Sequence, residues 1–262
     1  MKKVGVIFAA TLLTLSANSS TFACESKCSC SVLRPTKFTL NGSAQVTGSS
    51  THPVLRLTEE LGQAGSAFLT EPVDIQRGFN TSFAFQITDP EGISDTDGQG
   101  ADGITFVIQS VSDTAIGGAG GGIGYYNIGD ASLGVEFDSW YNPDIGDVDG
   151  NHIGINLNSS ISSVVSKSIP PSLINAVPAR LNNGAVWFAW VDYDGRQLQV
   201  RLSPTCDRPK KALLAHRISS DELSTLLGGD TDVFIGFTSG TGSAGGNHDI
   251  LCWNLKVKHG HR

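Results

Sequence analysis

The sequence predicts an all-β protein in which one domain of two packed sheets takes up most of the 262 residues. Short segments that alternate apolar and polar side chains recur along the chain, and this pattern is typical of half-buried strands. Only Ser219–Leu227 has the composition of a helical turn. The chain has 31 glycines and 16% charged residues, with no linker, fixed-period repeat or shift in composition. We therefore expect a single domain.

The strongest strand signal of the first half is Phe79–Thr88, because Phe83, Phe85 and Ile87 fall on one face. Shorter strands are expected at Phe38–Leu40, Ala44–Val46, Val54–Leu57, Ala67–Leu69 and Ile104–Val111. Between strands, Asp89–Gly92 predicts a turn and Asp95–Gly100 a polar, flexible loop. The glycine-rich stretch Ile116–Gly124 lacks a following Lys-Ser/Thr pair, so it favours close approach of the backbone to a ligand over a phosphate-binding loop.

In the second half, two alternating runs, Gly134–Trp140 and His152–Leu157, enclose an acidic loop. Ser159–Ser168 is a serine-rich strand or turn. Tyr193–Arg196 predicts a hairpin turn between two strands. The expected elements around and after it are strands at Ala185–Asp192 and Gln197–Leu202, the helical turn, a strand at Val233–Thr238, a small-residue loop at Ser239–Asn247 and a last strand at Ile250–Val257.

The formal net charge of −7 argues against nucleic acid as a partner, since nucleic-acid binding needs basic patches. Residues 1–23 have the features of a secretory signal peptide, with Lys2 and Lys3 before the apolar run Val4–Leu15 and a small-x-small site at Thr21–Ala23. No second apolar run has the length of a transmembrane segment. We expect a secreted or periplasmic protein, with 24–35 as a short N-terminal segment.

Five cysteines follow the predicted cleavage site, namely Cys24, Cys28, Cys30, Cys206 and Cys252. Secretion permits disulfides, but an odd number leaves one cysteine over. A Cys206–Cys252 pair is one option, and the sequence does not fix the connectivity. Cys24 could instead carry a lipid anchor, although Thr21 is a poor match for the aliphatic residue that such a site needs.

The stretch Gly134–Ser162 predicts a site for divalent cations. Glu136 and Asp138 point the same way on one strand, and His152 opens the next. The loop between them is rich in oxygen ligands: Asn142, Asp144, Asp147, Asp149 and Asn151. Carboxylate and amide oxygens suit calcium, and an imidazole suits a transition metal such as manganese. The alternative is a solvated acidic hairpin, which leaves two carboxylates near a core without a partner charge.

Five segments in order resemble the legume-type (L-type) lectins. They are Ala101–Phe106, Gly121–Gly124, Val135–Asp138, Asn151–Ile155 and Gly236–Thr238 with His248–Trp253. The resemblance covers Phe38–Val257, and we expect an L-type lectin domain over 36–258. It implies a concanavalin A-like jelly roll of two large antiparallel sheets, and a function in reversible glycan binding without catalysis. The cysteines are not typical of plant members, which favours a non-plant, bacterial-like secreted member.

The resemblance also implies two adjacent ions, calcium and manganese or another divalent transition metal. By position, Glu136 and His152 would bind only the transition metal, Asp138 and Asp147 both ions, and Asn142 with the Trp140 carbonyl the calcium. Ser162 falls where a water-mediated ligand is expected. Asp144 and Asp149 have no assigned role.

The sugar contacts implied by the resemblance lie beside the calcium. Asp102 would accept hydrogen bonds from sugar hydroxyls, after a cis Ala101–Asp102 bond. Gly121 would donate its backbone N–H, the Asn142 amide would donate as well, and the Trp140 ring would stack on the sugar. Backbone amides of Thr241–Asn247, including Ser243 and Ala244, would select the sugar.

Two other functions fit the fold. Related jelly rolls include glycosidases with Glu-x-Asp-x-x-Glu or Glu-x-Asp-x-Glu on one strand, but Trp140 and Tyr141 stand at the positions of the second acid. A structural or adhesion module that has lost the sugar site is the other alternative, although Asp102, Gly121 and Asn142 are in place. Sheet-edge dimers are common in the family that the chain resembles, and the sequence leaves open whether this chain forms a homodimer.

Overall fold

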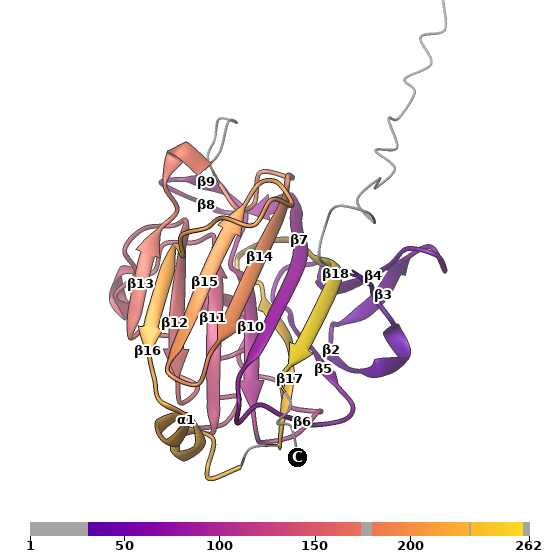
Figure 1. Ribbon diagram of the computed structural model, residues 1–262. Helices are drawn as coiled ribbons and strands as arrows, with labels where there is room; N and C mark the ends of the chain where they lie inside the picture. The colour runs from indigo at the N-terminus through magenta and orange to yellow at the C-terminus, as the bar shows by residue number, and fades with distance from the viewer. Residues whose placement is uncertain (1–30, 174–179, 231, 259–262) are drawn as a thin grey trace, which may run out of the picture.

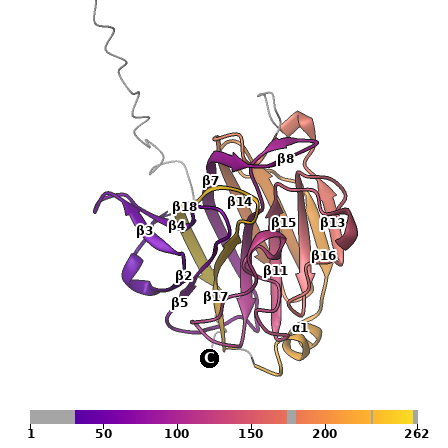
Figure 2. The same ribbon diagram turned by 180° about the vertical axis from the view of Figure 1, so that it is seen from behind.

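The computed structural model describes residues 31–173, 180–230 and 232–258. Its main body consists of two sheets packed face to face (Figures 1 and 2). Every strand pair in them is antiparallel. This confirms the prediction of a single all-β domain of two large sheets. The signal peptide expected at 1–23 lies outside the described residues.

The first sheet contains eight strands. In spatial order they are β16 (Leu214–Arg217), β15 (Gln197–Ser203), β14 (Val186–Tyr193), β7 (Phe79–Gly92), β18 (Ala244–Val257), β4 (Pro53–Thr58) and β3 (Gln45–Gly48), with β1 (Ser31–Val32) paired to β18. Ser31 and Val32, which belong to the predicted N-terminal segment 24–35, are therefore part of this sheet.

The second sheet also contains eight strands. In spatial order they are β13 (Val165–Ser168), β12 (His152–Leu157), β11 (Ser132–Asp138), β10 (Gly103–Gln109), β17 (Asp232–Gly240), β5 (Ala64–Leu69) and β2 (Phe38–Gly42), with β6 (Val73–Asp74) paired to β17. A separate hairpin is formed by β8 (Ser94–Asp95) and β9 (Gly98–Gln99). Short 3-10 turns lie at η1 (Pro35–Lys37), η2 (Gly120–Gly122), η3 (Pro143–Ile145) and η4 (Pro171–Leu173).

The α-helix α1 spans Ser220–Leu226, as the sequence predicts. Ser219 caps it, with the Ser219 side chain accepting from the Glu222 N–H and the Glu222 side chain accepting from the Ser219 N–H. No helix in the described ranges is long and apolar enough to cross a membrane.

Aromatic side chains fill the space between the sheets. The alternation of β7 sends Phe83 and Phe85 inward, where they meet Phe106 and Phe137 of the facing sheet. The rings of Phe83 and Phe237 pack edge to face, with centroids 4.9 Å apart. Each fully buried Phe contributes about 1.5–3 kcal/mol. This core holds the strand ends in fixed positions.

Three predictions about loops are wrong. Asp89–Gly92 is not a turn, because β7 continues to Gly92 through a bulge at Asp89, whose φ is 49°. Asp95–Gly100 contains the β8–β9 hairpin, since Asp95 Oδ1 accepts the N–H groups of Asp97 and Gly98. Ser239–Asn247 is mostly strand, because its small residues pair with β10 and β7. Only residues 241–243 remain as a loop.

The suggested Cys206–Cys252 pair is also wrong. Cys206 is free. Cys252 is disulfide-bonded, but not to Cys206. The two cysteines share an apolar patch with Phe188 and Trp190.

Candidate functional site

Three loops of the second sheet lie together at one end of the neighbouring strands β10, β11 and β17. Gly103, at the start of β10, pairs with Asp138 at the end of β11 and with Gly240 at the end of β17. The residues that follow or precede these strand ends therefore lie together, including Asp102, Trp140 and Thr241. Gln109 pairs with Ser132 and Phe234 at the other ends of the same strands. The two ends of these strands are about 20 Å apart, from the length of β10 and the usual rise per residue of a strand.

The sheet register brings the predicted metal ligands together. Glu136 and Asp138 share one face of β11, and Asp138 lies directly opposite His152 on β12. All three residues are at most 2% exposed. Ligand atoms of Asp138, Asp147 and His152 lie within 4.8 Å of one another.

The orientation of the His152 ring is fixed by a backbone carbonyl. Its Nδ1 lies 2.8 Å from the carbonyl oxygen of Asp149, which can only accept, so Nδ1 carries a hydrogen. Nε2 has no hydrogen-bond partner and lies 3.5 Å from Glu136 Oε1 and 3.8 Å from Asp147 Oδ1. A ring held this way aims Nε2 at the carboxylates, which is how metal-binding imidazoles are oriented.

The shifted pKa values of these residues indicate that the cluster favours a bound positive charge. Burial lowers the pKa of His152 most, but the nearby carboxylates of Glu136, Asp138 and Asp147 together outweigh it and raise this pKa to about 9. Burial raises the pKa of Asp147 to about 6 and that of Asp138 well above its ordinary value. A proton or a cation is therefore required to offset the buried negative charge.

The acidic side chains also shape the loop after β11. Asp138 Oδ1 accepts the Trp140 N–H at 2.7 Å, and Asp147 Oδ2 accepts the Asn142 N–H at 2.7 Å. The turn η3 follows directly, with Pro143 at its first position. Asn142 Oδ1 is buried and has no partner.

Asp102 also carries a buried atom without a partner. Its side chain is 4% exposed, Oδ2 has no hydrogen-bond partner, and burial raises its pKa to about 7. The Ala101–Asp102 bond is cis, as predicted.

Glycines line the space between Asp102 and Asn142. A Cβ at Gly121 would lie 3.1 Å from Asn142 Oδ1, and one at Gly242 would lie 3.8 Å from Asp102 Oδ2. The Gly121 N–H makes no hydrogen bond among the described residues. The glycine-rich stretch therefore brings backbone close to both side chains, as its composition indicates.

The other predicted contacts vary in position. Trp140 is partly exposed and follows β11. Ser243 is exposed and its carbonyl accepts the Ile93 N–H, while Ala244 is 3% exposed and begins β18. Ser162 is exposed, and its N–H donates to Ser160.

Three contributors were not assigned from the sequence. Ser163, not Ser162, contacts the acidic cluster, with its hydroxyl 2.6 Å from Glu136 Oε1. Asn156 donates to Glu136 Oε2. Asp149 orients the ring of His152 through its carbonyl. The three-residue spacing from Asp149 to His152 is the only local signal that could have indicated this last role.

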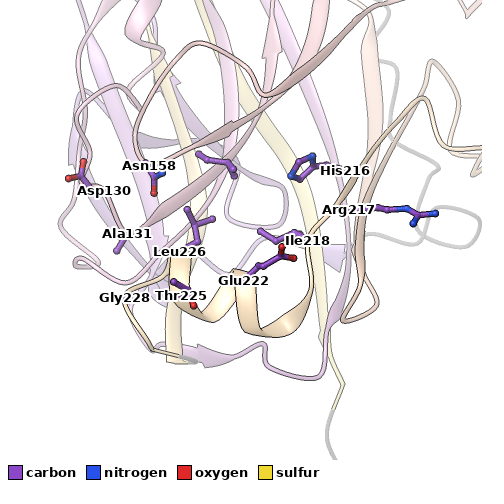
Figure 3. A pocket seen from close by; sticks show the side chains of 11 residues that line it. Asp130, Ala131, Asn158, His216, Arg217, Ile218, Glu222, Thr225, Leu226 and Gly228 are labelled. Carbon is purple, nitrogen blue, oxygen red and sulfur yellow. The ribbon is translucent and has the colours of Figure 1, made fainter.

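A separate cavity lies at the opposite end, beside α1 (Figure 3). It measures about 740 Å³ and is lined in part by Asp130, Asn158, His216 and Glu222. None of its lining side chains has a buried polar atom without a hydrogen-bond partner. The buried, unpartnered atoms of Asp102, Asn142 and His152 lie at the other end of the strands.

Comparisons with solved structures agree with this architecture. Peanut lectin with a 9mer peptide is 26% identical, with a TM-score of 0.61 over 85% of this chain and 93% of that chain. Basic winged bean lectin with Tn-antigen is 25% identical, with a TM-score of 0.63 over 84% and 92%. The exoplasmic/lumenal domain of VIP36 in its Ca²⁺/Man-bound form, 17% identical with a TM-score of 0.60 over 86% and 85%, shares the fold.

The curated relatives include plant receptor kinases of Arabidopsis thaliana. L-type lectin-domain containing receptor kinase IV.3 is 30% identical over 243 residues, which is 86% of this chain and 34% of that protein. Probable L-type lectin-domain containing receptor kinase I.2 is 31% identical over 241 residues, or 82% and 33%. The chain thus spans about a third of their length. The expectation of a non-plant member stays a prediction. A profile described as Legume lectin domain matches residues 31–262, and the chain belongs to this family.

Proposed function

We propose that this chain binds glycans reversibly, that binding depends on calcium and a divalent transition metal, and that no catalysis takes place. The observation that supports this most is a set of buried, unpartnered atoms at one end of the strands: Asp102 Oδ2, Asn142 Oδ1 and His152 Nε2. Burying such atoms without partners is costly, so the site favours ligands that supply them.

The residues present fit the two ions. Glu136 and His152 would hold manganese or a similar transition metal, and Asp138 and Asp147 would supply carboxylate oxygens to both ions. Asn142 Oδ1 and the Trp140 carbonyl would complete an all-oxygen calcium set. The cations would neutralise the cluster and fix the loop 139–151. Ser162 remains a proposed water-mediated ligand, and Ser163 is the serine whose contact with Glu136 supports such a role.

The proposed contacts at Asp102 and Gly121 use groups without a hydrogen-bond partner among the described residues. Asp102 would accept from two sugar hydroxyls, because its Oδ2 faces the space lined by Gly120 and Gly242. Gly121 would donate its N–H and Asn142 its amide hydrogens. The Trp140 ring would pack on the apolar face of the sugar. The backbone at Ser243 and Ala244 would limit which sugar fits.

The absence of catalysis is part of the proposal. Retaining glycosidases place two carboxyl groups about 5–5.5 Å apart across the bond that breaks. Glu136 and Asp138 point into the cation cluster, and Trp140 and Tyr141 occupy the positions of the further acid. No observation favours the hydrolase or the sugar-inactive module.

The remaining expectations on organisation are proposals as well. They are a signal peptide at 1–23, a segment at 24–35, a lectin domain at 36–258, secretion or periplasmic location with lipid anchoring at Cys24 as the alternative, and a homodimer. Signal cleavage is testable by N-terminal sequencing of the exported protein.

A glycan array tests the function. The protein is applied with Ca²⁺ and Mn²⁺, then with a chelator, and we expect binding only with the ions. Asp102→Ala should abolish binding, whereas Asp144→Ala, an exposed acid in the adjacent loop, should not. Normal glycan binding in chelator would refute the metal dependence. Release of reducing sugar that persists after metal removal would refute the lectin assignment.

A further inference from the structure

Arg180 is a buried cation with two unpartnered nitrogens in the part of the chain that the structure describes. Its side chain lies in the segment before β14, is 8% exposed, and its Nε and Nη2 make no hydrogen bond. Burial lowers the pKa of Arg180 below its ordinary value, and Asp95 and Asp97 only partly oppose this. Residues 174–179, which precede it and are not described, contain no Asp or Glu. A buried guanidinium is costly unless an anion meets it.

Two acids act on the charge of Arg180, and one of them, Asp95, is engaged elsewhere. Asp95 Oδ1 accepts from the β8–β9 turn, and Asp95 Oδ2 accepts the Tyr141 N–H at 3.2 Å. Neither Asp95 nor Asp97 accepts a hydrogen bond from Nε or Nη2 of Arg180, although both attract its charge. The Nη1 side of the guanidinium packs on Gly98, where a Cβ would lie 2.1 Å from Nη1. The Nε–Nη2 edge is therefore the part left to a ligand.

A cavity of about 320 Å³ adjoins this side chain. Its lining comprises Thr88, Asp89, Pro90, Gln99, Arg180 and residues 182–184. Asn182 is 5% exposed and donates through Nδ2 to the carbonyls of Gln99 and Gly100, which fixes its amide and leaves Oδ1 without a partner. Asp89 is held by Asn247, whose Nδ2 donates to it at 2.6 Å.

Arg180 and Asn182 line the same cavity, so one ligand with complementary groups suits both. An Nε–Nη2 edge matches two oxygens of a planar carboxylate, and an orphan amide oxygen matches a hydroxyl donor. A carboxylate and hydroxyls on one small ring describe an acidic sugar. We propose that Arg180 and Asn182 form a second, metal-independent site for an acidic saccharide. The choice of a saccharide rests on the proposed glycan binding, whereas the anion site does not.

Isothermal titration calorimetry in the presence of a chelator tests this second site, because the proposed cation-dependent glycan site is then inactive. The probes are sodium glucuronate, sodium galacturonate and N-acetylneuraminate, with methyl glucoside as the neutral control and sodium sulfate as the plain anion. We expect at least one acidic sugar to bind and methyl glucoside not to bind. Arg180→Gln should weaken that binding about tenfold or more. The matched variant Arg196→Gln, at an exposed arginine, should leave it unchanged.

Failure can be assigned to one hypothesis. If none of the acidic sugars binds, or Arg180→Gln binds as well as wild type, the second site is refuted. Sulfate binding as tight as that of the sugars would refute the saccharide assignment. Absence of neutral-glycan binding with Ca²⁺ and Mn²⁺ would instead count against the proposed function. Thermal unfolding checks folding: without ligand, Arg180→Met should melt at or above the wild-type temperature, because an uncompensated charge is removed. A lower melting temperature would indicate a structural tether and refute the site.

Discussion

His152 and His248 have the same burial and similar hydrogen bonding, but their surroundings differ. Both are 0% exposed, both bond through Nδ1, and in both Nε2 has no partner. His152 faces carboxylates, and its pKa is raised to about 9. His248 meets the hydroxyl of Thr58 at 2.7 Å, and burial lowers its pKa to about 4. Neighbouring charge, rather than burial, therefore separates a cation site from a core histidine.

The two regions also differ in their role for the fold. Thr58 contacts Ser239, whose hydroxyl donates to the carbonyl of Gly103 beside Asp102. Asp249, next to His248, makes a two-point ion pair with Arg56, with both distances at 2.8 Å. The His248 region thus ties strands together under the site without anionic groups facing its ring. It should support stability and not cation binding.

The largest expected effect is the loss of cation stabilisation. Ca²⁺ with Mn²⁺ at about a thousandfold over Kd should stabilise the wild-type fold by about 4 kcal/mol. Asp138→Asn should remove this gain, since Asp138 is central to the cluster. Thermal unfolding with and without the ions measures it. Asp144→Asn and His248→Gln are the controls and should retain the gain. Stabilisation of Asp138→Asn equal to that of wild type would contradict the assignment.

The next effect is the pH dependence of cation affinity. His152 has a pKa raised to about 9 in the metal-free protein, so a cation must displace its proton below that pH. Affinity for Mn²⁺ should rise from pH 7 to 9, by about tenfold per unit for one displaced proton. Titrations in buffers of different ionisation enthalpy count the protons released. His248→Gln should keep the slope, and a flat profile in wild type would contradict the proton–cation competition.

The stability of the fold in acid gives the third test. It concerns His248, whose pKa is shifted in the opposite direction to that of His152. The pKa of His248 is lowered from 6.5 to about 4 in the folded state, so the unfolded chain binds more protons between these values. Its contribution is fully present above pH 6.5 and is lost as the pH falls to 4, by about 3 kcal/mol in total.

Urea unfolding of metal-free wild type and His248→Gln across pH 4–7 isolates this contribution. The raised pKa values of Asp102, Asp138 and Asp147 act in the other direction, but they are common to both proteins and cancel in the difference. Parallel curves would show that His248 is not the neutral core residue described above.

The cation cluster was predictable from the sequence because its signal is local. Strict alternation places Glu136 and Asp138 on one face, and the second alternating run places His152 beside them. The strand ends were harder to predict. Ala244 and Asp89 have weak strand preferences, and they extend β18 and β7 because each strand pairs with the other. Arg180 had no local signal, since its neighbours come from distant segments.

The smallest effect separates two adjacent serines. The family resemblance selects Ser162, whereas the structure places the Ser163 hydroxyl 2.6 Å from Glu136 Oε1 and 2.8 Å from Asn156 Oδ1. A contact that orients a metal ligand is worth about 10-fold to 100-fold in affinity. Ser163→Ala should therefore weaken Mn²⁺ binding by about tenfold.

Ser162→Ala should leave Mn²⁺ affinity unchanged, because the Ser162 side chain is exposed. Titration of both variants with Mn²⁺ at one pH measures the difference, and Thr58→Ala, which removes a hydroxyl beside His248, should lower stability without changing the affinity. Weakening by Ser162→Ala alone would restore the assignment implied by the family. It would also mean that the loop 158–164 rearranges when the cation binds, because one residue must replace the other at Glu136.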